Sequence, residues 1–161
     1  MPPEGWKPRV YETLDELRAE LDRVEAAHQR GTLTTTGQWS AGQILEHCAT
    51  LIRCSIDGFG DARVPWFVRL AGRVVFKPRL GRTRMKPGIK LPRKASSLLP
   101  GETVGVDEGL SAMRAVLARI EAGERMTADS PVLGPMTHEQ WLTLHLDHCR
   151  LHLGFLDLGV S

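Results

Sequence analysis

The stretch THEQWLTLHLDHCRLHLGFLDL, residues 137–158, decides the fold that we expect for this chain. It opens on a capping box, because the Thr137 hydroxyl can accept from the amide of Gln140 while the Gln140 side chain reaches back to the amide of Thr137. No proline follows, and the single glycine, Gly154, comes near the end. The pattern predicts a helix of about five to six turns over residues 137–158.

One face of this helix carries a column of rings. At about 100° per residue, four of them fall within an arc of about 60°: Trp141, His145, His148 and His152. Apolar residues flank the column, and protonated imidazole is costly to bury, so its histidines should be neutral and either hydrogen-bonded or bound to a metal. His148 and His152 are four residues apart, which places their Cβ atoms about 6 Å from each other and lets both rings reach one ion.

Length and composition are those of one ordinary globular domain over residues 1–161, with 42% hydrophobic and 25% charged residues. The sequence contains no run of 18 apolar residues, so we expect no membrane span. The first residues lack the apolar centre of a signal peptide. The three cysteines form no CxxC pair, so we expect a reduced, cytoplasmic setting. A net charge of only +2 argues against a dedicated nucleic-acid protein.

Three more helices are expected, each with an apolar stripe at helical spacing. Two begin at capping boxes (Thr13 with Glu16, Ser40 with Gln43), and the three span residues 13–29, 40–58 and 107–122. We see no alternating strand pattern. The sequence therefore predicts an all-α fold, an antiparallel four-helix bundle with a long basic crossover, residues 62–106, between its second and third helices.

The second helix supplies a further imidazole. His47 comes three residues after Ile44 and four before Leu51, so it belongs to the buried side of that helix. Together with His148 and His152 it offers three nitrogens from two helices. Three ligands with an open fourth position are typical of a catalytic transition-metal site. The alternative is a metal-free core in which the histidines hydrogen-bond to one another.

The crossover has an unusual charge. Eleven of the 21 Lys and Arg residues lie in residues 62–101, which contain no Asp or Glu. Its first half predicts a short amphipathic helix, with Trp66, Phe67, Leu70, Val74 and Val75 opposed to Arg69, Arg73 and Lys77, and its second half predicts an extended loop. Such a segment is either a surface for nucleic acid, anionic lipid or an anionic small molecule, or a merely solvated connection. We favour the solvated connection, because aromatic residues are not interleaved through the basic loop.

Two motifs resemble those of a known superfamily. Residues 39–47, WSAGQILEH, resemble the W-S-x-x-x-x-L-x-H entry to the second helix of DinB-like (YfiT-like) four-helix-bundle proteins, and His148 with His152 resembles their HxxxH. Residues 134–137, GPMT, with Glu139, Trp141 and His145, are similar to an uncharacterised bacterial branch of that superfamily. The resemblance covers most of the chain and is weakest through the basic crossover.

The resemblance implies a divalent metal (zinc, nickel, iron or manganese) held by His47, His148 and His152. Better-studied relatives include S-transferases that use a low-molecular-weight thiol (bacillithiol, mycothiol or glutathione) and a mycothiol-dependent isomerase, and many relatives are homodimers. This chain departs from them where Leu153 and Phe155 replace an Arg and a Gln and where Leu151 replaces a second histidine. We therefore expect a metal-dependent transferase or hydrolase of small molecules, without an assigned reaction.

Further residues remain candidates for the same site. His145 and Cys149 form a rival pair four residues apart, either as alternate ligands or as groups that orient the ligands from behind. Four arginines of the crossover are candidates for binding an anionic co-substrate: Arg69, Arg73, Arg82 and Arg84. The alternative to an enzyme is a binding module that uses the bundle cavity or the basic surface of residues 62–101 for an anionic ligand, a membrane or a partner.

Overall fold

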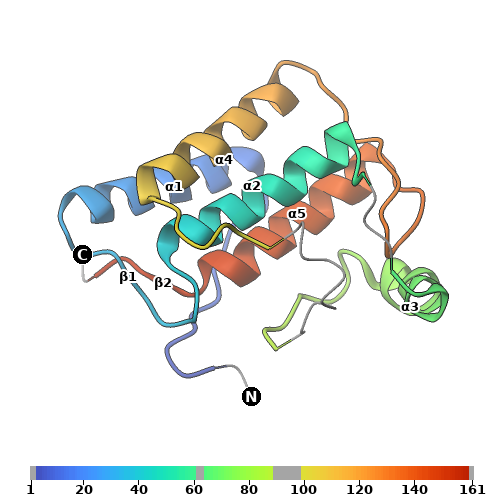
Figure 1. Ribbon diagram of the computed structural model, residues 1–161, viewed down its shortest axis with the longest axis horizontal. Helices are drawn as coiled ribbons and strands as arrows, with labels where there is room; N and C mark the ends of the chain where they lie inside the picture. Colours follow the sequence, from blue (N-terminus) through green and yellow to red (C-terminus); the bar gives the residue numbers. More distant parts are fainter. Residues whose placement is uncertain (1–2, 61–63, 89–98, 160–161) are drawn as a thin grey trace.

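The computed structural model describes residues 3–60, 64–88 and 99–159, and within them the fold is predominantly helical (Figure 1). The all-α expectation is thus confirmed at that level, while a small two-stranded sheet was not expected. The elements follow in this order: α1 (Leu14–Gln29), β1 (Thr34–Thr35), α2 (Ala41–Asp57), α3 (Trp66–Ala71), the π-helical η1 (Gly72–Phe76), the 3₁₀-helical η2 (Lys77–Arg79), α4 (Val106–Glu121), α5 (His138–Leu153) and β2 (Leu156–Asp157). None of the described helices is both long and apolar enough to cross a membrane.

Three helices begin where their capping boxes predict. The hydroxyls of Thr13, Ser40 and Thr137 each accept from the backbone amide three residues on, and the side chain at that third position returns the bond. Such a reciprocal pair satisfies two of the amides that a helix start leaves without a partner. The register of α1, α2 and α5 is therefore fixed at their first turn.

The helix predicted over residues 137–158 is shorter in the structure, since α5 ends at Leu153. The N-terminal segment occupies its C-terminal carbonyls: the Trp6 indole donates to Leu151 O, and the Arg9 guanidinium donates to the carbonyls of Leu153 and Leu156. The chain then turns into β2, which pairs antiparallel with β1, with Thr35 opposite Leu156. The prediction of five to six turns was wrong because these long-range contacts end the helix.

The core lies between α1, α2, α4 and α5, with α2 packed against both α4 and α5 and α1 packed on α4 (Figure 1). The stripes predicted to face inward are buried, with Leu21 of α1, Ile52 of α2 and Leu117 of α4 among the least exposed side chains. Helices α2 and α4 approach closely because Gly109 has no side chain: a Cβ there would lie 2.8 Å from the carbonyl oxygen of Gly42. Leu146 and Leu153 of α5 are also buried within the chain itself.

The first half of the basic crossover is helical, as predicted, and runs through α3, η1 and η2. In Figure 1 this segment lies at one end of the molecule, apart from the long helices. Residues 82–88 contain turns and irregular backbone, and the expected extended loop lies partly outside the described residues, which omit 89–98.

Candidate metal centre

Three histidines meet between α2 and α5. His47 projects from α2 with 3% of its surface exposed, while His148 and His152 come from successive turns of α5. The ring centroids lie 4.9 Å apart for His47 and His148, 4.6 Å for His47 and His152, and 4.4 Å for His148 and His152. One ligand atom from each residue falls within 4.8 Å of the others. We call these three residues the three-histidine cluster. Among the described residues, these are the His, Cys, Asp or Glu side chains that lie close enough together, in a group of three or more, to hold a metal ion.

Two histidines of the cluster, His148 and His152, are neutral at ordinary pH. Burial lowers the pKa of His148 well below its usual value, and the neighbouring His152 and His47 lower it further. Burial, and then His47, lower the pKa of His152 to about 3. Neutral imidazole is the form that binds a metal, because a ring nitrogen must present its lone pair to the ion.

The distances suit a single small cation. The Nε2 atoms of His47 and His148 lie 3.1 Å apart. Two nitrogens that bind a tetrahedral zinc at about 2.0–2.1 Å lie roughly 3.3 Å from each other. In a metal-free core the same contact would be a hydrogen bond, with one of the two neutral rings donating to the other. His148 Nδ1 is buried and has no hydrogen-bond partner in the described part of the chain, so the ring is not held by a network of protein bonds.

Trp39 closes one side of the cluster. Its indole stacks on His152, with centroids 5.7 Å apart and ring planes 15° apart, and lies 4.9 Å from the His47 ring. Trp39 directly precedes the N-cap Ser40 of α2, so the same turn that starts the helix places the indole over the imidazoles. The sequence alone does not predict a role for Trp39 in the site. Its position just before the helix that carries His47 was the available signal.

His145 is separate from the cluster although it belongs to the same column on α5. The Ser55 hydroxyl donates to the carbonyl of Ile52, which can only accept, so His145 Nε2 must donate to Ser55 Oγ over 2.9 Å. The ring also stacks on Trp141, with centroids 5.2 Å apart. Burial lowers the pKa of His145 to about 3, which makes it a weak base at neutral pH. These contacts suit a packing and orienting role, not a proton shuttle.

Cys149, the other candidate alternate ligand, also lies outside the cluster. It is fully buried in the core beside Cys48, which is equally buried. A hydrogen bond with Cys149, and then burial, raise the pKa of the Cys48 thiol well above its usual range. A metal binds the thiolate, so this buried environment does not favour Cys48 as a ligand.

The four candidate anion-binding arginines lie in different surroundings. Arg84 pairs with Glu12 at 2.6 Å and approaches Asp147 at 3.8 Å, so nearby carboxylates offset its charge. Arg73 packs its guanidinium against the backbone of Gly134, and Arg69 is exposed. The structure does not bring the four together into one anion clamp.

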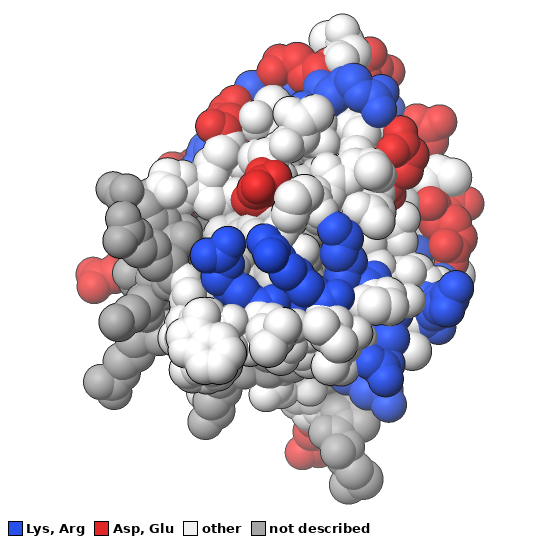
Figure 2. Space-filling view, turned by 90° about the vertical axis from the view of Figure 1, so that its right-hand side faces the viewer, with Lys and Arg blue, Asp and Glu red and all other residues white. Residues whose placement is uncertain are grey.

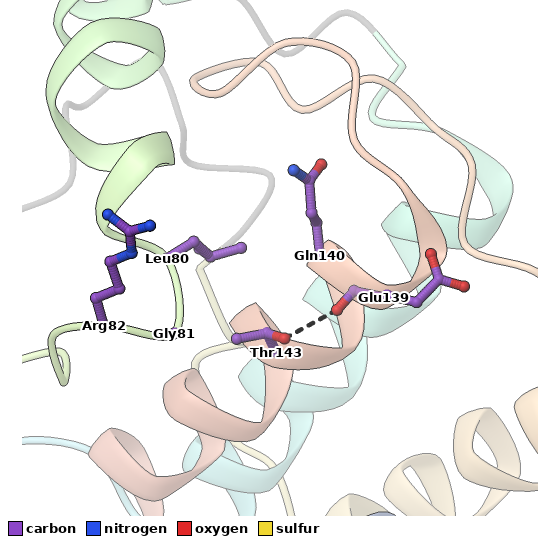
Figure 3. Close-up of a pocket in the computed structure, with 6 residues that line it drawn as sticks. All are labelled: Leu80, Gly81, Arg82, Glu139, Gln140 and Thr143. Atoms are coloured by element: carbon purple, nitrogen blue, oxygen red, sulfur yellow. Dashed lines mark hydrogen bonds between the residues drawn. The ribbon is translucent and has the colours of Figure 1, made fainter.

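Arg82, the fourth of these arginines, lines an open hollow of about 320 Å³ between the crossover and the start of α5 (Figure 3). Leu80 points from the crossover toward α5, and the Thr143 hydroxyl donates to the carbonyl of Glu139. Gly81 and Gln140 complete the lining, and no histidine of the cluster belongs to it. The hollow is therefore a different place from the candidate metal centre.

Asp147 and Glu46, which flank the histidines in sequence, both bind neighbouring groups. Asp147 is buried and accepts from Arg150 and from the backbone amide of Met85, which ties the crossover to α5. Glu46 accepts from the amide of Gly101. Asp147 thus pairs with a basic residue, whereas Glu46 binds a backbone amide.

Comparison with known families now adds one finding. Residues 9–158 match the model of a family described as a protein of unknown function, DUF1569. The chain belongs to the DUF1569 family. No curated protein and no solved structure matches it. The DUF1569 match includes Trp39 and all three histidines of the cluster, but its description assigns no activity, so the function must be argued from the geometry.

Proposed function

We propose that this DUF1569 chain binds one divalent transition metal through His47, His148 and His152 and is a metal-dependent enzyme acting on small molecules. The observation that carries the proposal is the meeting of three imidazoles from two helices, the buried His47 and the half-buried His148 and His152, with ligand atoms within 4.8 Å of one another. Burial keeps His148 and His152 in the neutral form that a metal requires.

Three protein ligands leave a coordination position for a substrate, which is the arrangement of catalytic rather than structural zinc sites. A bound metal would lower the pKa of a thiol or water molecule beside it and so supply a nucleophile at neutral pH. The chain's own residues hold the ligands in place: Trp39 stacks over His152, and the capping box at Ser40 fixes the register of α2. His145 donates from Nε2 to Ser55 and stacks on Trp141 within the same column.

For the reaction we propose transfer of a small thiol, with hydrolysis of a small molecule as the second possibility. This choice rests on the resemblance to DinB-like proteins, and we interpret the packing of α1, α2, α4 and α5 as the antiparallel four-helix bundle of that superfamily. The homodimer that the resemblance implies stays a prediction.

The test uses metal-free protein reloaded with zinc, nickel, iron(II) or manganese, one at a time. Each form is assayed for conjugation of glutathione, bacillithiol or mycothiol to an electrophilic dye, and for hydrolysis of an activated ester. We expect a rate that needs one of the metals and that is lost in His148→Ala. A chain that binds metal but shows no metal-dependent rate in either assay would contradict the enzymatic part of the proposal and leave a metal-binding module.

A further inference from the structure

Large apolar side chains gather on the outside of one short segment. Of the eight large hydrophobic residues that are exposed within the described chain, six lie between Trp66 and Phe76, in α3 and η1. Trp66 is 75% exposed, Phe67 59% and Val74 64%. Scattered single hydrophobic residues on a surface are ordinary, but a contiguous group on one helix marks an interaction site.

The opposite side of the same segment is seated on the loop that precedes α5. Gly72 is buried there, and a Cβ at this position would lie 2.4 Å from the carbonyl oxygen of Val132. Lys77 Nζ donates to the carbonyl of Pro135. These contacts hold one side of the helix against the protein. The apolar side therefore faces outward.

Helical geometry orders the remaining side chains. At about 100° per residue, the four outward apolar residues span about 100°: Trp66, Phe67, Leu70 and Val74. Gly72 falls roughly opposite the middle of that arc, and Arg69 and Arg73 fall on one flank between the two sides. We call the four outward residues the apolar face. In helices that lie in a membrane interface, the cations are beside the apolar face and not opposite it. Arg69 and Arg73 have this arrangement.

The segment that carries the apolar face has charge of one sign. Residues 62–101 contain no Asp or Glu, and Arg69, Arg79 and Arg82 are all exposed. Figure 2, which views the end of the molecule where α3 lies, shows a band of basic side chains bordered by uncharged ones. A cationic band beside exposed apolar side chains is complementary to an anionic lipid surface, where phosphates lie above acyl chains.

We propose that the apolar face of α3 and η1, with Arg69 on its flank and the exposed Arg82 further along the same basic segment, docks this protein on the surface of an anionic lipid membrane. Nucleic acid fits the face less well, because only Trp66 and Phe67 offer rings on which a base can stack, whereas Leu70 and Val74 are aliphatic. The sequence favoured a merely solvated crossover. The exposed apolar residues that the structure places beside the cations are the reason to depart from that interpretation. The proposal is independent of the metal, since none of its residues belongs to the three-histidine cluster.

The test measures co-sedimentation of the full chain with vesicles of phosphatidylcholine alone and of phosphatidylcholine mixed with phosphatidylglycerol. We expect binding to the anionic vesicles that weakens as salt rises from about 0.05 M to about 0.5 M, and little binding to the neutral ones. The double variant Trp66→Ser/Phe67→Ser should bind at least about tenfold more weakly. The charge variant Arg69→Glu/Arg82→Glu should lose at least about tenfold as well.

Matched controls change exposed residues elsewhere: Val10→Ser/Leu99→Ser for the apolar pair and Arg30→Glu for the charge, and both should bind like the parent chain. The parent's metal content and thermal midpoint should be unchanged in all of these variants, which separates this proposal from the metal site. Absence of parent binding to anionic vesicles at low salt would overturn the proposal, as would full binding by Trp66→Ser/Phe67→Ser. If the parent chain does not bind vesicles but forms a dimer, and Trp66→Ser/Phe67→Ser dissociates that dimer, the apolar face binds a second copy of the chain instead.

Discussion

His47 Nε2 lies 3.1 Å from His148 Nε2, although the two residues are 101 positions apart in the chain. Two imidazole nitrogens this close need either a proton shared between them or a cation that both lone pairs can face. A cation there would join α2 to α5, because its ligands come from both helices. The proposed site therefore makes predictions about stability as well as about chemistry.

Removal of metal should destabilise the fold. A ligand present at about 100 times its dissociation constant adds about 2.7 kcal/mol to the free energy of unfolding, which for a chain of this size raises the thermal midpoint by about 5 to 10 °C. We expect a chelator to lower the midpoint by that amount and excess metal to restore it, as followed by circular dichroism. The double variant His148→Ala/His152→Ala should have the same midpoint with and without metal; a metal-dependent shift in that variant would contradict the ligand assignment.

His145→Phe should retain the metal and change the pH dependence of stability. In the native chain burial lowers the pKa of His145 from 6.5 to about 3, so between these values the unfolded chain binds a proton that the folded chain does not. Stability from this residue is complete above about pH 6.5 and falls as pH decreases, by about 1.4 kcal/mol per pH unit.

The measurement is urea unfolding of metal-free parent and His145→Phe at pH 7.5 and pH 5. Phenylalanine can still stack on Trp141 but cannot take up the proton, so the variant should lose about 2 kcal/mol less than the parent between the two pH values. Equal losses would show that His145 is not buried in its neutral form, and loss of metal from the variant would make His145 a ligand after all.

Gly42→Ala should destabilise the contact between α2 and α4. Alanine in place of glycine within a helix normally gains up to about 1 kcal/mol. Here a Cβ would lie 2.1 Å from the carbonyl oxygen of Val104, so the clash outweighs the gain, and we expect a net loss of about 1 to 3 kcal/mol in chemical unfolding. Gly101→Ala is the control, because a Cβ there meets only ordinary contacts at 3.5 Å and beyond. A variant Gly42→Ala as stable as the parent would mean that the two helices lie further apart.

Arg150→Met should cost more than the same change at Arg18, whose partners Asp15 and Glu121 are exposed. Arg150 is buried and donates to the carbonyl of Tyr11, to Asp147 and to Glu12, so its loss leaves the buried Asp147 with fewer partners. Breaking a buried pair costs about 3 to 5 kcal/mol, whereas surface pairs such as that of Arg18 contribute about 0 to 1 kcal/mol. Unfolding of Arg150→Met and Arg18→Met by urea compares the two, and equal costs would contradict the burial of the network.

The inward position of His47 could be predicted from the sequence because local signals determine it. The capping box at Ser40 starts α2, and the spacing of Ile44 and Leu51 then turns His47 to the buried side. Capping and periodicity act within a few residues, so they can be read without the rest of the fold.

Long-range contacts explain what the sequence did not reveal. Trp6 donates to the carbonyl of Leu151 across 145 positions, and strands of two residues are too short to show an alternating pattern. The prediction that the column of rings lies on one face of α5 was correct. However, His145 and His148 are about 4.5 Å apart along the helix axis, and His145 contacts Ser55 instead of the cluster. In α3 and η1 the amphipathic pattern identified two unlike sides without showing which one packs inward. The side with Gly72 packs inward, because the absence of a side chain there lets the helix backbone approach the backbone of Val132.

Metal content per chain is the measurement that tests the central claim most directly. The chain is prepared without a histidine tag, loaded with excess transition metal, desalted and analysed by mass spectrometry. Beside it are analysed His47→Ala, His148→Ala, His152→Ala and, as a control outside the cluster, the half-exposed His28→Ala. The account predicts about one divalent ion per chain in the parent and the control, and less than about a tenth of that in each cluster variant, with helical content retained. A parent chain that holds no metal, or cluster variants that hold as much as the parent, would contradict it.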